Sequence, residues 1–154
     1  VFLFEVQSLL GTPNFGMPRR TVEGYDKNRV EILSAVLSRS LKVDVNSKDI
    51  YINIPGGIDL NDRSSDLAVV FSLLSSIKGI PVSQKIAAIG ELGLRGEVRK
   101  VSFIKNRVNE LEKLGFVGVY LPKSHQADFE KEKIKTKIKL NYISNISELV
   151  ERIR

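Results

Sequence analysis

Apolar residues recur every three or four positions in three long stretches of the chain, which is the spacing that gathers them on one face of an α-helix. Asp26 precedes the first stretch and can cap its helix, with Arg29 and Arg39 on the solvent side. Gly79 and Gly115 end the second and third helices. The apolar faces predicted in this way are Val30, Leu33, Leu37 and Leu41; Leu67, Val70, Phe71 and Leu74; and Ile104, Val108, Leu111 and Leu114.

Shorter apolar runs, bounded by turn-forming residues, predict β-strands. Two Pro and two Gly within 11–18 predict an ordered loop, because such a sequence disfavours both helix and sheet. Residues 94–98 predict a hairpin in which Gly96 supplies the turn. The predicted strands are 2–10, 19–23, 50–54, 86–92 and 117–121, followed by a turn or short helix over 124–129 and a terminal helix over 146–153.

Lysines alternate with other residues near the C-terminus. This period of two predicts a half-buried strand with a solvated lysine face, and edge strands often carry lysine because it prevents aggregation. The alternative is a stripe that binds nucleic acid. The lysines are Lys131, Lys133, Lys135, Lys137 and Lys139, and they alternate with Ile134, Thr136, Ile138 and Leu140.

The predicted strands and helices alternate irregularly and include neighbouring hairpins. This order favours an α+β fold over a doubly wound parallel sheet. With 154 residues, 42% of them apolar, the chain has the size of one domain with its own core, which we place at 1–154.

Composition narrows the functional classes further. There is no Cys and a single His, so a thiolate metal site or a His cluster is excluded, and we expect no cofactor in this domain. No apolar run approaches the length of a membrane span, and the N-terminus lacks the features of a signal peptide, so we expect a cytoplasmic protein without a membrane partner. The net charge of +6 is compatible with a polyanionic partner. Because the chain opens without Met in a strand-like run, we expect a domain cut from a longer protein.

The segment 56–70, read with 89–99, resembles the proteolytic domain of Lon-type proteases. The resemblance implies a two-layer α/β fold similar to that of some ribosomal proteins, and a catalytic Ser-Lys dyad. In such a dyad a lysine amine acts as base for a serine hydroxyl at a helix start. On this pattern Ser64 takes the nucleophile position and Lys105 takes the position of the base.

The match departs from a protease motif around the serine. Asn61 replaces an acidic residue, and larger or charged residues, among them Asp66, replace Gly and Pro. We expect a carboxylate at Asp66 to disfavour an oxyanion and to hold Lys105 protonated. Two interpretations follow: a residual Ser-Lys peptidase that uses Ser64 and Lys105, or a domain without catalysis in which Ser64 merely begins a helix.

The chain also resembles the C-terminal Lon-like domains of the RadA (Sms) family of bacterial DNA repair proteins. Residues 4–9 and 15–29, which include Phe-Gly-Met-Pro-Arg-Arg, carry this resemblance, and 53–58, 65–69, 90–98 and 113–123 continue it. A magnesium-chelatase-like family shares the Lon-like pattern, but it fits the Pro-Arg-Arg segment less well. In the RadA family the domain is regarded as non-proteolytic.

This resemblance implies a parent protein with a zinc finger and an ATPase core upstream, so that ATP, magnesium and zinc are expected only there. The parent would be a DNA-dependent ATPase or helicase that drives branch migration as a hexameric ring, with DNA, single-stranded or branched, and a RecA-type recombinase as partners. The chain itself contains no P-loop motif. The domain would then contribute ring assembly and a basic surface for DNA, or ring assembly alone.

A basic cluster is the candidate for that surface. Arg19, Arg20, Lys27 and Arg29 fall within eleven positions, and guanidinium groups bind phosphate oxygens in a bidentate manner. The cluster lacks interleaved aromatic residues, so it suits binding without sequence preference. The alternative is that these side chains pair with nearby acidic groups, namely Glu23, Asp26 and Glu31.

Overall fold

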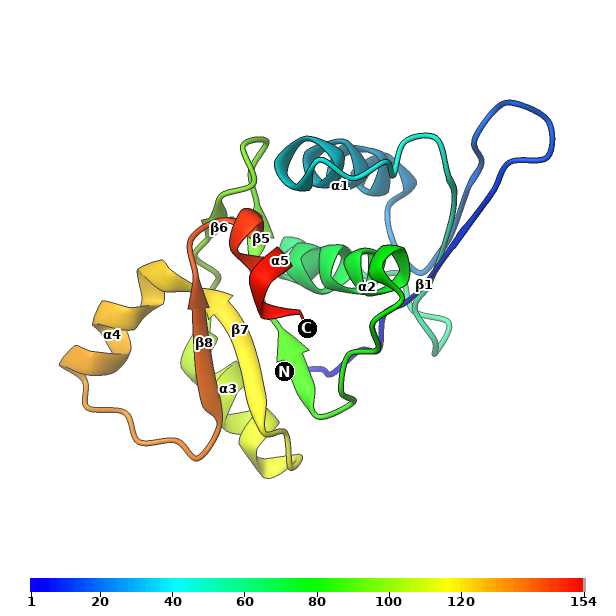
Figure 1. The fold of residues 1–154 in the computed structure, drawn as a ribbon. Helices are drawn as coiled ribbons and strands as arrows, with labels where there is room; N and C mark the ends of the chain where they lie inside the picture. The colour runs from blue at the N-terminus through cyan, green and yellow to red at the C-terminus, as the bar shows by residue number, and fades with distance from the viewer. Residues whose placement is uncertain (154) are drawn as a thin grey trace.

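Figure 1 shows a computed structural model of the chain, which describes residues 1–153. Its strands form two three-stranded sheets and a two-stranded hairpin, and helices pack between and against them. The strands are β1 (Gln7–Gly11), β2 (Arg20–Glu23), β3 (Asp49–Asn53), β4 (Ile86–Ala88), β5 (Glu91–Leu92), β6 (Val98–Arg99), β7 (Gly118–Pro122) and β8 (Lys139–Ile143). The α-helices are α1 (Lys27–Leu41), α2 (Asp66–Lys78), α3 (Ile104–Lys113), α4 (Gln126–Lys131) and α5 (Leu149–Arg152), and single 3₁₀ turns are η1 (Arg63–Ser65), η2 (Lys123–His125) and η3 (Ile146–Glu148).

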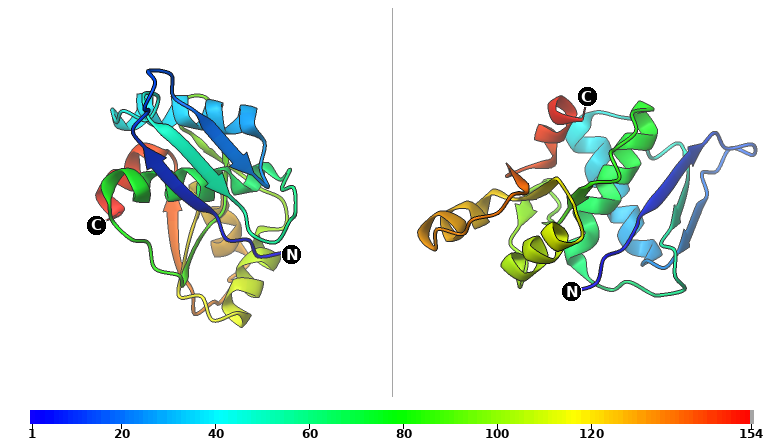
Figure 2. Two further views of the ribbon diagram at one scale, coloured as in Figure 1. Left: turned by 90° about the vertical axis from the view of Figure 1, so that its right-hand side faces the viewer. Right: turned by 90° about the horizontal axis from the view of Figure 1, so that it is seen from below.

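The first sheet has the strand order β1-β3-β2, with β1 antiparallel and β2 parallel to the central β3. Strand β1 begins at Gln7, which is paired with Asn53, the last residue of β3. The predicted strand over 2–10 is therefore too long at its start, because residues 2–6 lie beyond the end of β3 and have no neighbouring strand to bond to. A loop is predicted over 11–18, and the structure has one over 12–19, between β1 and β2. It projects from the body of the molecule (Figure 2).

Helices α1 and α2 pack on this sheet and on each other, and their apolar faces make the larger of two cores. The Asp26 carboxylate caps α1 as predicted, since it accepts hydrogen bonds from the backbone N–H groups of Asn28 and Arg29. The short C-terminal helix α5 closes the same core with Leu149.

The second sheet is parallel throughout, in the order β4-β7-β8. Helices α3 and α4 supply a second, smaller core around Val119 and Leu121. The two sheets and their helices stand side by side along α2 (Figure 1). The fold is therefore mixed α and β in a single small domain, and the predicted α+β class is confirmed.

The predicted strand over 86–92 is two strands, because the chain changes partner in the middle. Strand β4 pairs with β7, whereas β5 turns away to pair with β6, and the Gly90 N–H donates to the Ser64 carbonyl at the break. The predicted hairpin is confirmed, with Gly96 in the left-handed conformation (φ +79°) that the turn requires.

The lysine-rich segment does not form the predicted strand, although its lysines are exposed as predicted. Lys131 ends α4, residues 132–138 are irregular, and only Lys139 lies in β8. Strand β7 begins at Gly118, which pairs with Lys139, so the preceding residues have no strand to join. All five lysines are nevertheless exposed, while Ile138 is buried in the second core. The terminal helix over 146–153 is the 3₁₀ turn η3 followed by α5.

Candidate functional site

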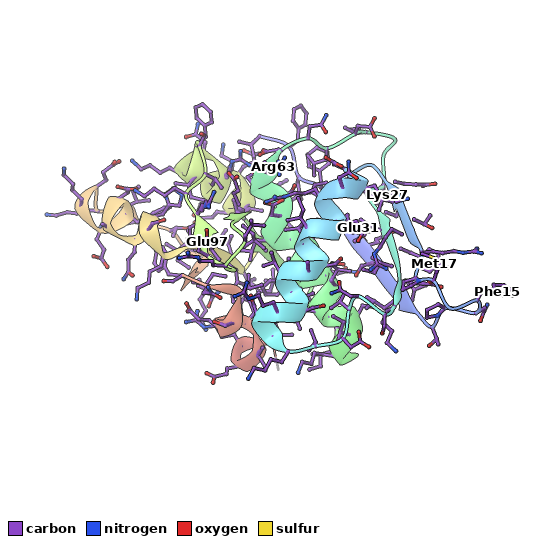
Figure 3. All side chains as sticks on the ribbon, turned by 90° about the horizontal axis from the view of Figure 1, so that it is seen from above. Phe15, Met17, Lys27, Glu31, Arg63 and Glu97 are labelled. Atoms are coloured by element: carbon purple, nitrogen blue, oxygen red, sulfur yellow. The ribbon has the colours of Figure 1, made fainter. Side chains whose placement is uncertain are left out.

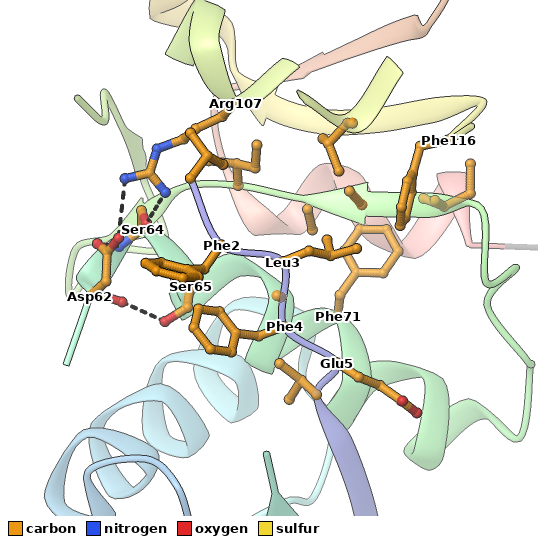
Figure 4. A pocket seen from close by; sticks show the side chains of 18 of the residues that line it. Phe2, Leu3, Phe4, Glu5, Asp62, Ser64, Ser65, Phe71, Arg107 and Phe116 are labelled. Atoms are coloured by element: carbon orange, nitrogen blue, oxygen red, sulfur yellow. Dashed lines mark hydrogen bonds and ion pairs between the residues drawn. The ribbon is translucent and has the colours of Figure 1, made fainter. Parts of the chain in front are cut away.

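Ser64 lies in the single turn η1, immediately before α2. The Asp62 carboxylate caps this turn by accepting from the Ser64 N–H at 2.9 Å, so the serine is held at a helix start as its sequence position suggested. The residue is almost completely buried. Its Oγ accepts a hydrogen bond from Arg107 Nη1 at 2.9 Å (Figure 4).

Arg107 reaches the serine from α3. Its second guanidinium nitrogen pairs with Asp62 at 3.1 Å, so one side chain binds both the hydroxyl and the carboxylate (Figure 4). Burial raises the pKa of Asp62, but hydrogen bonds from Ser64 and Arg107 outweigh burial, and the pKa lies below its ordinary value. The Ser64 hydroxyl is therefore bound by the arginine of an ion pair.

Lys105 does not take the position of a base for Ser64. Its ammonium group pairs with Glu132, just beyond the end of α4. Lys105 and Arg107 are two residues apart on α3, and at 3.6 residues per turn they point about 200° apart. Because Arg107 faces Ser64, Lys105 is directed to the other side of the helix.

Asp66 lies inside the protein. Its carboxylate accepts from Arg29 Nε at 3.0 Å, from the Tyr25 hydroxyl at 2.6 Å and from the Leu92 N–H at 3.0 Å, and Arg29 also donates to the Leu92 carbonyl. The expectation that Asp66 would hold Lys105 protonated is wrong, since Glu132 is the partner of that lysine. The hydrogen bond to Asp66 raises the pKa of Arg29, and burial, followed by the hydrogen bond to Asp66, raises that of Tyr25.

The four members of the predicted basic cluster separate into two pairs. Arg29 is buried against Asp66, so the prediction that it lies on the solvent side is wrong, and it cannot reach a phosphate. The Arg20 side chain is 6% exposed, pairs with Glu31 and donates to the carbonyl oxygens of Asn46 and Lys48. By contrast, Arg19 and Lys27 are exposed, and no ion-pair partner binds either side chain within residues 1–153.

An elongated groove runs past Ser64. Its volume is about 1210 Å³, and it lies between α2, α3, β4 and the N-terminal residues Val1–Val6. Those residues cross it as an extended segment, with Phe2 and Phe4 beside Ser65 (Figure 4). The walls are mostly apolar, and Ser64, Asp62 and Arg107 occupy one end. The N-terminal segment thus crosses the groove, and a charged pair fills the end that a peptidase would need for its reaction.

Sequence reasoning missed three side chains that decide this chemistry. Arg107, Tyr25 and Glu132 carry no motif, and each acts through a partner far away in the chain. The only indication of Arg107 in the sequence is its position two residues after Lys105. Both residues lie in the first turns of α3, but their side chains are on different faces of the helix. Within residues 1–153 there is no group of His, Cys, Asp and Glu side chains that could hold a metal ion. None of the described helices combines the length and the apolar character needed to span a bilayer.

Comparison with known proteins identifies the family to which this chain is similar. Residues 29–153 match the C-terminal proteolytic domain family of Lon protease (S16). The chain is 40% identical to DNA repair protein RadA of Bacillus subtilis over 131 residues, which are 85% of this chain and 29% of that protein. It is 35% identical to RadA of Helicobacter pylori over 149 residues (97% and 32%), and 44% identical to RadA of Streptococcus pyogenes over 122 residues (79% and 27%). The chain therefore spans less than a third of the length of these relatives.

Proposed function

Because the chain belongs to the family of Lon-type C-terminal proteolytic domains and is similar to RadA-type DNA repair proteins, we propose that it is a non-proteolytic module of such a repair protein. In this role it binds DNA without sequence preference and helps to hold a ring of subunits together. ATP-driven branch migration would belong to other parts of the protein, which would also bind ATP, magnesium and zinc. A RecA-type recombinase is the expected further partner.

One observation is the main support for the proposal that the domain is not proteolytic. The Ser64 hydroxyl accepts its hydrogen bond from Arg107, whose guanidinium stays protonated in proteins and cannot act as a base. The lysine that the family pattern offers as base is paired with Glu132 on the other side of α3. The carboxylate beside the serine, Asp62, is bound to Arg107, and a serine without an available base is a poor nucleophile.

A covalent serine-directed probe tests this half of the proposal. We expect no labelling of Ser64 by a fluorophosphonate and no digestion of unfolded casein, even at high protein concentration. Replacing the serine (Ser64→Ala) provides the matched control, and it must leave any background signal unchanged. Labelling of the wild type that disappears in S64A would establish the residual peptidase instead.

The exposed basic residues support the DNA-binding half. Arg19 lies at the base of the projecting β1–β2 loop, and Lys27 lies at the start of α1 (Figure 3). Both are unpaired within residues 1–153, so an approaching phosphate would not have to displace a carboxylate from them. The net charge of +6 adds a general attraction to polyanions.

Salt-dependent binding to single-stranded DNA tests this surface. We expect the double replacement Arg19→Ala and Lys27→Ala to weaken affinity for short oligonucleotides of any sequence. The slope of log affinity against log salt should flatten by about 0.7 for each phosphate that the variant no longer neutralises. Fluorescence anisotropy over a range of salt concentrations measures both quantities.

A charge-matched control uses the lysine-rich segment after α4. The double replacement Lys133→Ala and Lys135→Ala removes the same charge from two exposed side chains in another part of the molecule. It should change affinity and slope much less than the Arg19 and Lys27 pair. Equal effects of the two double variants would remove Arg19 and Lys27 from consideration as the contact site.

A further inference from the structure

The β1–β2 loop presents two large apolar side chains to solvent. Phe15 and Met17 are 85% and 81% exposed, at the tip of a loop that projects far from the body of the molecule (Figure 3). Nothing else in the described chain covers them. Exposed apolar side chains of this size at a projecting tip are typical of a contact surface.

The groove beside Ser64 is the complementary feature. Several of its apolar lining residues remain uncovered, among them Phe103, which is 74% exposed, and Phe2, which is 84% exposed. Leu114 also lines the groove and is exposed, although its spacing in α3 predicts a core position. A volume of about 1210 Å³ is ample for two side chains such as Phe and Met.

The charges of the two surfaces are opposite. The loop over residues 12–19 contains one arginine, Arg19, and no acidic residue, while Arg20 beyond it is paired with Glu31. The groove is lined by four carboxylates and one arginine; Asp62 pairs with Arg107, and Glu110 pairs with Lys113, which leaves Glu5 and Asp59. A basic apolar loop therefore matches an acidic apolar groove.

The loop of one molecule cannot fill its own groove. The loop follows β1, whereas the groove is lined by the residues that precede β1, so the two features lie at opposite ends of that strand (Figure 1). A loop that fits a groove elsewhere on an identical molecule makes a head-to-tail contact, which repeats until it closes into a ring or extends as a filament.

We propose that Phe15 and Met17 of one copy insert into the groove of a second copy, between Phe103 and the N-terminal segment. This inference rests on the ring-forming part of the proposed function and names its interface. The groove beside Ser64 then binds the β1–β2 loop of the next copy, and we call the loop the plug and the groove the socket.

Self-association of the chain tests the interface. We expect the wild type to associate in a concentration-dependent manner in sedimentation velocity. A plug variant, Phe15→Ser with Met17→Ser, and a socket variant, Phe103→Asn, should each weaken association by about tenfold or more. Asn suits position 103 because the backbone there is left-handed (φ 59°), a conformation that Asn tolerates. The matched control is Leu94→Ser, which removes a similarly exposed apolar side chain at the tip of the β5–β6 hairpin and should associate like the wild type.

Mixing the two variants gives the sharpest test. The plug variant keeps an intact socket and the socket variant keeps an intact plug, so a mixture can form one productive contact but cannot extend it. We expect one-to-one heterodimers and nothing larger. A mixture that stays monomeric, variants that associate like the wild type, or a wild type that is monomeric at all concentrations would each overturn the proposal.

DNA affinity of the same variants separates this inference from DNA binding. With an oligonucleotide short enough for one copy, the plug and socket variants should bind as tightly as the wild type. Thermal unfolding of each variant excludes loss of folding as the cause of weakened assembly. Failure of the interface would thus leave the DNA-binding proposal standing, and failure of the Arg19 and Lys27 test would leave the interface standing.

Discussion

Two carboxylates four residues apart, on either side of Ser64, each bind an arginine, and they do so in opposite environments. The side chains of Asp66 and Arg29 are 0% and 9% exposed, whereas those of Asp62 and Arg107 are 47% and 23% exposed. The chemical groups are the same. Their energetic consequences differ, because a buried charge that loses its partner is far more costly than one that water can reach.

The comparison explains how one turn of the chain serves two purposes. Asp66 joins α1, α2, β5 and the segment before α1 through a fully hydrogen-bonded network, and so it fixes the larger core. Asp62 holds Arg107 over the Ser64 hydroxyl at the end of an open groove. The first pair makes the scaffold rigid, and the second fills the position where the family's reaction would occur.

The largest loss of stability is expected when the charge of the buried carboxylate Asp66 is removed. Asp66→Asn retains the shape of the side chain but leaves Arg29 charged, buried and without a counter-ion. We expect the free energy of unfolding to fall by about 3 to 5 kcal/mol. Urea unfolding followed by circular dichroism measures this loss.

Two control variants sharpen the comparison. Asp62→Asn removes the matching exposed charge, and it should cost about 1 kcal/mol or less. Adding Arg29→Met to Asp66→Asn removes the unpaired charge, and the double variant should be more stable than D66N alone. If Asp62→Asn and Asp66→Asn proved equally costly, burial would not distinguish the two pairs.

The sequence predicts the helices of this fold better than its strands. A helix is fixed by local spacing and capping, and Val30, Leu33 and Leu37 are buried behind the Asp26 cap as their spacing requires. A strand also needs a neighbour at the right register, which local spacing does not contain. This is why the predicted strand over 2–10 loses its first residues and why the lysine segment is exposed as predicted without forming a strand.

The same difference between local and long-range interactions applies to the candidate site. The position of Ser64 at a helix start could be predicted, because it depends on neighbouring residues such as Asp62. The partners of Lys105 and Arg29 could not be predicted, because Glu132 and Asp66 lie 27 and 37 positions away. Nearby acidic groups suggested pairing for the basic cluster, yet only Arg20 pairs with one of them, Glu31.

Replacing Tyr25 should change the free energy of unfolding less, and in a pH-dependent manner. Its hydroxyl donates to Asp66 in the buried network. Burial is the main reason that its pKa lies above the ordinary value, and the hydrogen bond to Asp66 and the charge of that carboxylate raise it further. In the unfolded chain the tyrosine loses its proton at about pH 10. The stability that depends on this proton is therefore fully present below pH 10 and is lost as the pH rises above it.

Tyr25→Phe isolates that contribution. At about pH 8 the variant should be less stable than the wild type by about 1 to 2 kcal/mol, because an acceptor on Asp66 loses its donor. Between about pH 10 and 11 the difference should narrow, since phenylalanine has no proton to lose and only the wild type is destabilised by deprotonation of residue 25 in the unfolded state. Urea unfolding at about pH 6 and 8 provides the control, because the difference must be constant where tyrosine does not titrate. A difference that also stays constant above pH 10 would mean that Tyr25 is accessible to water, and the buried network would then end at Arg29 and the Leu92 N–H.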